Sequence, residues 1–113
     1  MDVSELKKLQ KEFDEKHIGS YENLPEDLLF LATALAGEVG EFANLVKKYY
    51  RQHKFHSGVK DDSGRDYPAE MKKEIIDVFV YFLIIADQLD LDIEKDFLEN
   101  LERNKKRFQK DGD

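Results

Sequence analysis

The 113-residue sequence contains no cysteine and only two prolines and six glycines. The absence of cysteine excludes disulfide bonds, thiolate nucleophiles, cysteine-ligated zinc and iron–sulfur clusters. The sequence contains 18 lysines and arginines and 25 aspartates and glutamates, which gives a formal net charge of −7. Affinity for a nucleic-acid backbone comes mainly from basic residues that neutralise phosphates. A nucleic-acid partner is therefore not expected.

Long uninterrupted apolar runs are also missing. The longest, residues 75–86, contains Asp77 and is too short to span a bilayer, which takes about 20 residues. Residues 1–5 are charged and no apolar run follows them, so they do not resemble a signal peptide. We expect a cytoplasmic protein without a membrane partner.

The few glycines and prolines divide the chain into four helical segments. Residues 2–17 carry apolar side chains at helical spacing, with Asp2 as the expected cap. Pro25 is expected to open a second helix that runs to about residue 50, and Pro68 a third that runs to about residue 89. Asp92 is expected to cap a fourth helix, which ends near residue 108.

Residues 52–67 break this helical pattern, and we expect a long loop there, of the kind that forms a lid or a flap. The sequence shows no strand-like alternation and no repeat. It predicts an all-α fold, a bundle of four main helices that forms one domain over residues 1–113. The third helix is apolar on nearly all sides, and such a helix needs neighbours all round. We therefore expect a homodimer or homotetramer, in which oligomerisation completes the core.

Four acidic residues lie in the second and third helices, next to apolar stripes. Glu38 and Glu41 are three residues apart, so their side chains are neighbours beside the apolar face. Glu74 and Asp77 repeat this spacing in the third helix, where Asp77 is the only charged residue of the run 75–86. A buried carboxylate without a partner is costly and takes up a proton or binds a cation. Carboxylate oxygens are hard ligands that suit Mg²⁺ or Mn²⁺.

Each acidic pair taken alone is also typical of a solvated helix surface. The shared spacing on the two most hydrophobic helices favours a metal site over two surface pairs. A di-iron bundle is disfavoured, because it uses a histidine three residues after a glutamate, and no glutamate here has one. Asp14 and His17, one helical turn apart in the first helix, are interpreted as an ordinary surface pair.

At these acidic residues the sequence resembles the MazG-like all-α nucleoside triphosphate pyrophosphohydrolases, whose signature is Glu-x-x-Glu on one helix and Glu-x-x-Asp on the next. The matching segments are residues 37–42, with a glycine before and between the glutamates, and residues 74–78, followed by Tyr81. Residues 104–108 resemble the family's C-terminal segment of asparagine and basic residues. The resemblance extends over all four helices, about residues 3–108.

The resemblance implies hydrolysis of a nucleoside triphosphate between the α and β phosphates, to a monophosphate and pyrophosphate, as a means of cleaning the nucleotide pool. It implies that Mg²⁺, or Mn²⁺, is held by Glu38, Glu41, Glu74 and Asp77. A triphosphate carries about four negative charges, so a net-negative protein needs metal ions to approach it. One carboxylate is then expected to accept a proton from the attacking water, and Glu41 is the candidate.

Five further residues are candidates for contacts with the nucleotide. Asn104 falls on the apolar stripe of the fourth helix, where an amide needs a partner; it could instead cap a helix or join two subunits. Lys105 and Arg107 could contact phosphate, although basic residues also suit a helix C-terminus. Tyr81 follows the aspartate of the Glu-x-x-Asp pair by one helical turn. It either contacts a ligand or is a core tyrosine with a satisfied hydroxyl group. Gln10 in the first helix could read the edge of a base.

Two features depart from the resemblance. Between Glu41 and Glu74 lie 32 residues, a longer connection than in compact relatives, and Asn100 stands where relatives that cleave dCTP carry a lysine. Two alternatives remain: a phosphoribosyl-ATP pyrophosphatase, which resembles this family in fold and acid pattern, and a non-catalytic helical interaction module. Convergence of the four acidic residues on one pocket would argue against the module.

Overall fold

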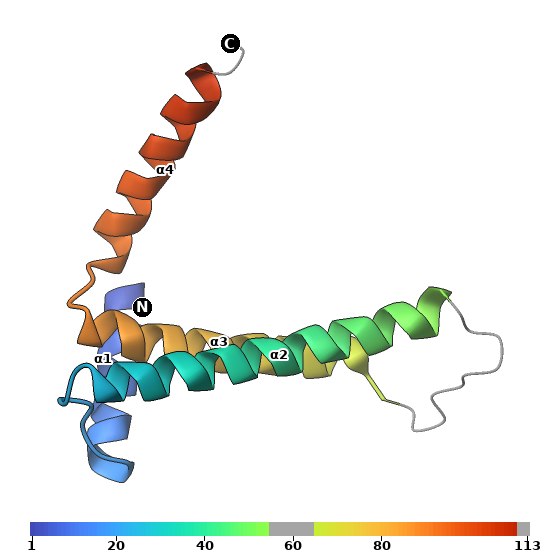
Figure 1. Cartoon of the computed structure of the whole chain (residues 1–113), viewed down its shortest axis with the longest axis horizontal. Helices are drawn as coiled ribbons and strands as arrows, with labels where there is room; N and C mark the ends of the chain where they lie inside the picture. The colour runs from blue at the N-terminus through green and yellow to red at the C-terminus, as the bar shows by residue number, and fades with distance from the viewer. Residues whose placement is uncertain (55–64, 111–113) are drawn as a thin grey trace. The chain divides into compact units, whose positions relative to one another are not determined.

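A computed structural model describes residues 1–54 and 65–110, and the side chains of residues 1–54 and 65–109. The described residues form four helices in the order α1 (Val3–His17), α2 (Glu26–Lys54), α3 (Tyr67–Gln88) and α4 (Ile93–Lys110), as Figure 1 shows. They contain no strand. The prediction of an all-α fold with four main helices is confirmed.

The helix starts follow the predicted capping residues. The Asp2 carboxylate accepts a hydrogen bond from the Glu5 backbone N–H at 2.9 Å, and Asp92 accepts one from the Lys95 N–H at 3.2 Å. Each bond satisfies one of the backbone donors that a helix leaves without a partner in its first turn. α1 ends at His17, and two residues later Gly19 has a φ of 138°, a backbone conformation that residues with side chains rarely adopt.

The predicted loop is shorter at both ends in the structure. α2 continues past Tyr50 to Lys54, and α3 begins at Tyr67 rather than Pro68. Proline is tolerated in the first turn of a helix because the N–H it lacks has no partner there anyway. The rest of the predicted loop, residues 55–64, lies outside the described residues, as does the prediction that it forms a lid or flap.

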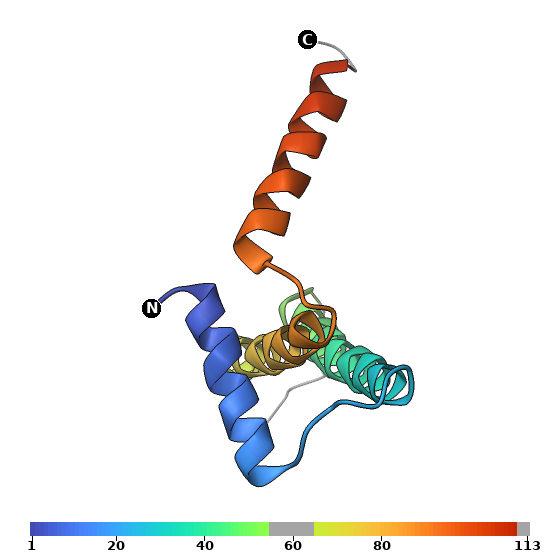
Figure 2. The same ribbon diagram turned by 90° about the vertical axis from the view of Figure 1, so that its left-hand side faces the viewer.

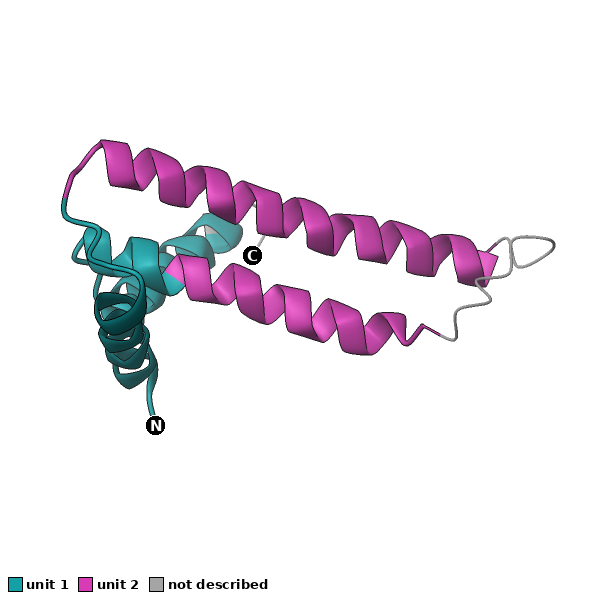
Figure 3. Cartoon of the chain, turned by 90° about the horizontal axis from the view of Figure 1, so that it is seen from below, with its two compact units in different colours: residues 1–22, 83–113 teal, residues 23–82 magenta. Residues whose placement is uncertain are grey.

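The chain divides into two compact units, coloured separately in Figure 3. Unit 1 comprises residues 1–22 and 83–113, and unit 2 comprises residues 23–82. The boundary between them falls inside α3, so this helix contributes residues to both units.

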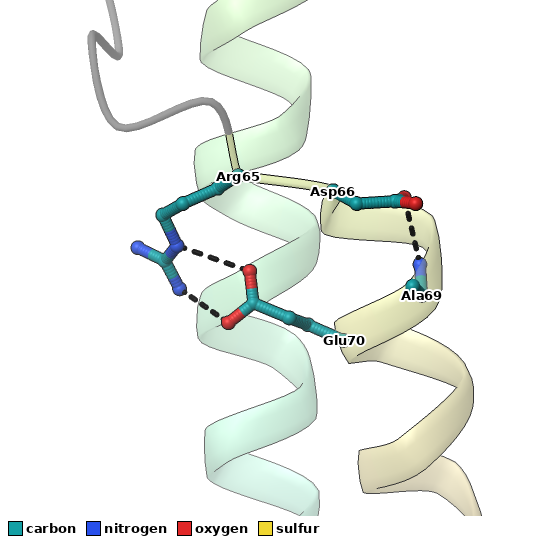
Figure 4. A network of polar contacts seen from close by, with 4 residues as sticks. All are labelled: Arg65, Asp66, Ala69 and Glu70. Atoms are coloured by element: carbon teal, nitrogen blue, oxygen red, sulfur yellow. Dashed lines mark hydrogen bonds and ion pairs between the residues drawn. The ribbon is translucent and has the colours of Figure 1, made fainter.

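Unit 2 is an antiparallel pair made of α2 and the first part of α3, which lie side by side in Figures 1 and 3. Its buried side chains include Leu31, Leu45 and Tyr67. The start of α3 is fixed by two contacts, drawn in Figure 4. The Arg65 guanidinium donates two hydrogen bonds to the Glu70 carboxylate, at 3.0 and 2.9 Å, and the Asp66 side chain accepts one from the backbone N–H of the first helical turn at Ala69.

Unit 1 contains α1, the end of α3 and α4. Leu83, Ile84 and Ala86 supply its buried apolar side chains. α1 contacts α4, and the two helices start near one another in Figure 2. The Lys7 ammonium donates a hydrogen bond to the Leu91 carbonyl at 3.0 Å, which ties α1 to the segment between α3 and α4.

Many large apolar side chains remain exposed in the single chain. The stripe predicted for the first helix is an example, since Leu9 is 49% and Phe13 53% exposed. α2 and α3 show the same feature at Leu29, Phe30 and Ile76, each more than half exposed. These side chains offer apolar surface that one copy of the chain does not cover.

α2 also has the length and composition of a helix that could cross a membrane. An 18-residue window within it has a mean hydropathy of 1.4, and 11% of that window is buried. The core helix of a soluble protein passes the same test. Glu38 and Glu41 interrupt the apolar residues of this helix, so it contains no long uninterrupted apolar run.

Candidate metal centre

Three of the four predicted carboxylates converge in unit 2. Glu38 and Glu41 extend from α2, and Glu74 extends from the adjacent part of α3. One carboxylate oxygen from each residue lies within 4.8 Å of the other two. The three-residue spacing places the two α2 side chains on one face, and the antiparallel partner helix brings the third carboxylate to them.

Two oxygens of this cluster are buried without a hydrogen-bond partner. They are Oε2 of Glu38 and Oε2 of Glu74. Glu41, in contrast, is exposed. Buried polar atoms in proteins are nearly always paired, and each exception calls for a reason. No donor among the described residues reaches either oxygen, so the partners that could satisfy them are a proton shared between the carboxyl groups, a cation or a water molecule.

The proximity of the three groups changes the acidity of Glu74. Burial of its carboxyl group, hydrogen bonding with Glu38 and Glu41, and the negative charges of these two neighbours raise its pKa from 4.5 to about 7. Two carboxyl groups can share a hydrogen bond only when one keeps its proton. The cluster therefore holds a proton up to near-neutral pH unless a cation replaces it.

The donor set fits a hard divalent cation. Carboxylate oxygens at this separation are the ligands that Mg²⁺ uses in proteins, usually together with water and substrate phosphate. The two buried oxygens without a hydrogen-bond partner are an additional feature that a bound cation would satisfy. Glu38, Glu41 and Glu74 therefore form an acidic cluster whose donor atoms fit a hard divalent cation.

Two glycines flank Glu38 along α2. At the positions where Gly37 and Gly40 would carry a Cβ atom, no described atom lies within 4 Å beyond their own chain neighbours and helix backbone. Glycine in a helix interior costs about 1 kcal/mol relative to alanine. The two glycines thus leave the space next to the backbone beside Glu38 unoccupied, and they lower the stability of the helix.

Asp77 and Tyr81 continue the same helix beyond Glu74. Asp77 follows Glu74 by three residues and is half-buried, but it does not belong to the group whose oxygens all lie within 4.8 Å of one another. Tyr81 is half-buried one turn further on. Asp77 as a metal ligand and Tyr81 as a substrate contact stay predictions.

The predicted phosphate contacts lie on α4, in unit 1. Asn104 is half-buried and borders a shallow hollow together with Lys105 and Phe108. The Lys105 ammonium pairs with Glu102 at 3.3 Å, and the Arg107 guanidinium lies 6.0 Å from the centre of the Phe108 ring. Their roles toward a nucleotide stay predictions.

Gln10 and Asp14 form a pair that the sequence did not reveal. The Gln10 amide donates a hydrogen bond to Asp14 Oδ1 at 3.0 Å, so this nitrogen is engaged, and a role in reading a base stays a prediction. Asp14, interpreted from the sequence as a surface partner of His17, is only 4% exposed. Burial raises its pKa, and the Gln10 hydrogen bond partly offsets that rise. The four-residue spacing between Gln10 and Asp14 places both side chains on one face of the helix, and this sequence feature could have revealed the pair.

Comparison with known proteins agrees with this geometry. Residues 27–110 match the MazG nucleotide pyrophosphohydrolase domain, and the chain belongs to that family. The matched range includes the whole acidic cluster and all of α4. The predicted resemblance is confirmed.

At the level of individual proteins, the chain is similar to the Gene 37 protein of Mycobacterium phage L5. The two are 36% identical over 86 residues, which is 76% of this chain and 68% of the phage protein. The phage protein's name describes no activity. No solved structure matches the chain significantly.

Proposed function

We propose that the protein is a Mg²⁺-dependent pyrophosphohydrolase that cleaves (deoxy)nucleoside triphosphates between the α and β phosphates. The products are the nucleoside monophosphate and pyrophosphate, and the role is cleaning of the nucleotide pool in the cytoplasm. The observation that carries the proposal is the cluster of Glu38, Glu41 and Glu74, with two buried oxygens that lack partners, in a member of a nucleotide pyrophosphohydrolase family.

Glu38, Glu41 and Glu74 would hold the metal ion, and we add Asp77 on the family's Glu-x-x-Asp pattern. Mg²⁺, or Mn²⁺ in its place, supplies screening of the phosphate charges and polarisation of the α-phosphorus when bound. Without a cation these carboxylates would repel the negatively charged triphosphate, so their role is to hold the metal ion.

Glu41 is the proposed acceptor of the proton that the attacking water loses. It is the exposed member of the cluster, so water reaches its carboxylate from solvent, while Glu38 and Glu74 each bury an oxygen. General bases of this kind contribute about 10²- to 10⁴-fold in rate.

The remaining contacts to the nucleotide are assigned to residues outside the cluster. Asn104, Lys105 and Arg107 on α4 supply donors that suit phosphate oxygens. Tyr81 offers a hydroxyl one turn after Asp77, and Gln10 offers an amide for the base.

A screen of nucleoside triphosphates for pyrophosphate release, with Mg²⁺ and with EDTA, tests the proposal. We expect release with Mg²⁺ for at least one canonical or modified nucleotide and none with EDTA. Phosphoribosyl-ATP belongs in the same screen, since exclusive turnover of that compound would assign the protein to the alternative enzyme. No turnover of any substrate would favour the non-catalytic interaction module, against which the convergence of three acidic residues argues.

We also propose that the working form is a homodimer or homotetramer. Leu29, Phe30 and Ile76 are 71%, 57% and 58% exposed in one copy, and apolar surface of this extent on α2 and α3 normally marks an interface. On this basis α2 is a core helix of a soluble oligomer rather than a membrane span. Sedimentation velocity should give a dimer or larger species without detergent; a monodisperse monomer would contradict the proposal.

A further inference from the structure

Unit 1 contains a cavity that shares no residue with the acidic cluster. It has a volume of about 100 Å³ and lies between α1, the segment of residues 19–22 and the end of α3. Leu83 and Ile84, both buried, form part of its wall. The cavity is therefore large enough for a small organic group and has one apolar side against which a flat group can pack.

The charged groups around this cavity are mostly carboxylates. Asp14, Glu15, Glu22 and Asp87 line it, against two lysines, Lys7 and Lys11. Both ammonium groups are already engaged. Lys7 donates to the Leu91 carbonyl at 3.0 Å, and Lys11 pairs with Asp87 at 3.6 Å. The cavity thus presents net negative charge and favours a cation or a hydrogen-bond donor over an anion.

Asp14 is the best-placed recognition group. Its side chain is 4% exposed and lines the cavity. Gln10 donates to one of its oxygens at 3.0 Å, which uses one of about four acceptor positions that a carboxylate offers. A buried carboxylate with acceptor capacity left over, set beside an apolar wall, is suited to a planar group that carries two parallel N–H donors.

We propose that this cavity binds a planar N–C–N group with paired N–H donors, of the guanidinium type, through the Asp14 carboxylate. Such a group forms two parallel hydrogen bonds with a carboxylate and can pack a flat face on Leu83 and Ile84. Two sources share this chemistry: a free guanidinium compound, and the N1–N2 edge of a guanine base. The proposal is independent of the pyrophosphohydrolase activity.

Binding is tested by two-dimensional NMR of the full chain titrated with methylguanidinium chloride and, separately, with guanosine. Tetramethylammonium and inosine are the matched probes, because the first has charge without N–H donors and the second lacks the amino group of guanine. We expect shifts centred on Asp14, Leu83 and Ile84 with both guanidinium-type probes and at least tenfold weaker binding of the matched ones. Shifts centred on Glu38 and Glu74 instead would place the cation at the acidic cluster and overturn the proposal.

Two variants and one control locate the contact. Asp14→Asn keeps the shape of the side chain and should weaken methylguanidinium binding at least tenfold, whereas Glu12→Gln, which removes a charge from the same helix outside the cavity, should leave it unchanged. Ser20→Phe adds bulk at an exposed position of the cavity wall and should also block binding, which keeps the test decisive if Asp14→Asn does not fold.

The outcomes divide clearly. Binding of both probes at Asp14 supports the site and favours the base of a nucleotide as ligand, and binding of methylguanidinium alone supports a site for a free cation. No binding at millimolar concentration, or equal binding by wild type, Asp14→Asn and Ser20→Phe, overturns the proposal.

Discussion

Unit 1 and unit 2 differ in whether their buried carboxyl groups find hydrogen-bond partners among the described residues. In unit 1, Asp14 is buried but accepts a hydrogen bond from Gln10, and Lys7 and Lys11 each have an oxygen partner. In unit 2, Glu38 and Glu74 each bury an oxygen that has none. Both units contain buried carboxyl groups, so burial alone does not mark a metal site. The missing partner is what distinguishes the candidate metal site from a buried carboxylate that is already hydrogen-bonded within the chain.

The largest expected effect is on turnover, after one carboxylate of the cluster is removed. Glu41→Gln should lower turnover by about 10²- to 10⁴-fold, the range expected for loss of a general base, while the helical circular dichroism spectrum stays unchanged. The matched control is Glu26→Gln, the same change in the first turn of α2, which should keep wild-type turnover. Retained activity in Glu41→Gln would remove this residue from the mechanism.

Metal binding should stabilise the protein through unit 2 alone. A ligand that binds only the folded state at 100 times its Kd adds about 2.7 kcal/mol, which corresponds to a rise in Tm of roughly 10 °C for a chain of this size. Differential scanning calorimetry with Mg²⁺ and with EDTA measures this rise. Glu38→Gln should abolish most of it, and Glu12→Gln in unit 1 should retain it. An unchanged Tm at millimolar Mg²⁺ would argue against the site.

The pH dependence of the metal-free protein offers a third test. The pKa of Glu74 is raised in the folded state from 4.5 to about 7, so the folded protein binds this proton more tightly than the unfolded chain. Its stabilising contribution is fully present below about pH 4.5 and is lost as the pH rises through about 7. Tm measured in EDTA should therefore fall over this interval.

Substitution of Glu38 separates the contribution of Glu74 to the pH dependence of Tm from the contributions of other titrating groups. In Glu38→Gln one source of the raised pKa is gone, so the fall in Tm between these pH values should be smaller than in wild type. Glu26→Gln should follow the wild-type profile. Parallel profiles for wild type and Glu38→Gln would show that the two carboxyl groups do not interact.

The smallest effect is expected for an ion pair of unit 1. Lys11 and Asp87 are 3.6 Å apart, and their side chains are 53% and 25% exposed. Exposed pairs contribute about 0.2–1 kcal/mol because solvent screens them. Lys11→Met should lower the free energy of unfolding by less than about 1 kcal/mol in urea titrations. A loss of several kcal/mol would mean that unit 1 depends on its charges far more than the comparison implies.

The fold was predictable because its signals are local. Asp2 and Asp92 cap helices as expected, since capping depends on residues three positions apart. The end of α2 was placed too early, because Arg51, His53 and Lys54 are polar, and the sequence pattern does not separate a helix end from a helix whose exposed last turn carries basic residues.

The convergence of the carboxylates was predictable only where helical spacing decides it. The spacing of Glu38 and Glu41 places them together whatever the tertiary structure, and the antiparallel pairing with α3 brings Glu74 to them. Asp14 was misread because its burial depends on packing against the end of α3 and the segment after α1, which no local pattern encodes. Whether Asn104 and Arg107 contact a nucleotide depends on tertiary arrangement in the same way, and these contacts stay predictions.

The glycines on either side of Glu38 have a consequence for the stability of this helix. α2 gives up about 1 kcal/mol of helix propensity at each of Gly37 and Gly40, although no described neighbour occupies the space a methyl group would take. Gly40→Ala should therefore stabilise α2 by about 1 kcal/mol without a clash with any described residue. Loss of turnover in this otherwise more stable variant would show that the glycine serves the reaction and not the fold.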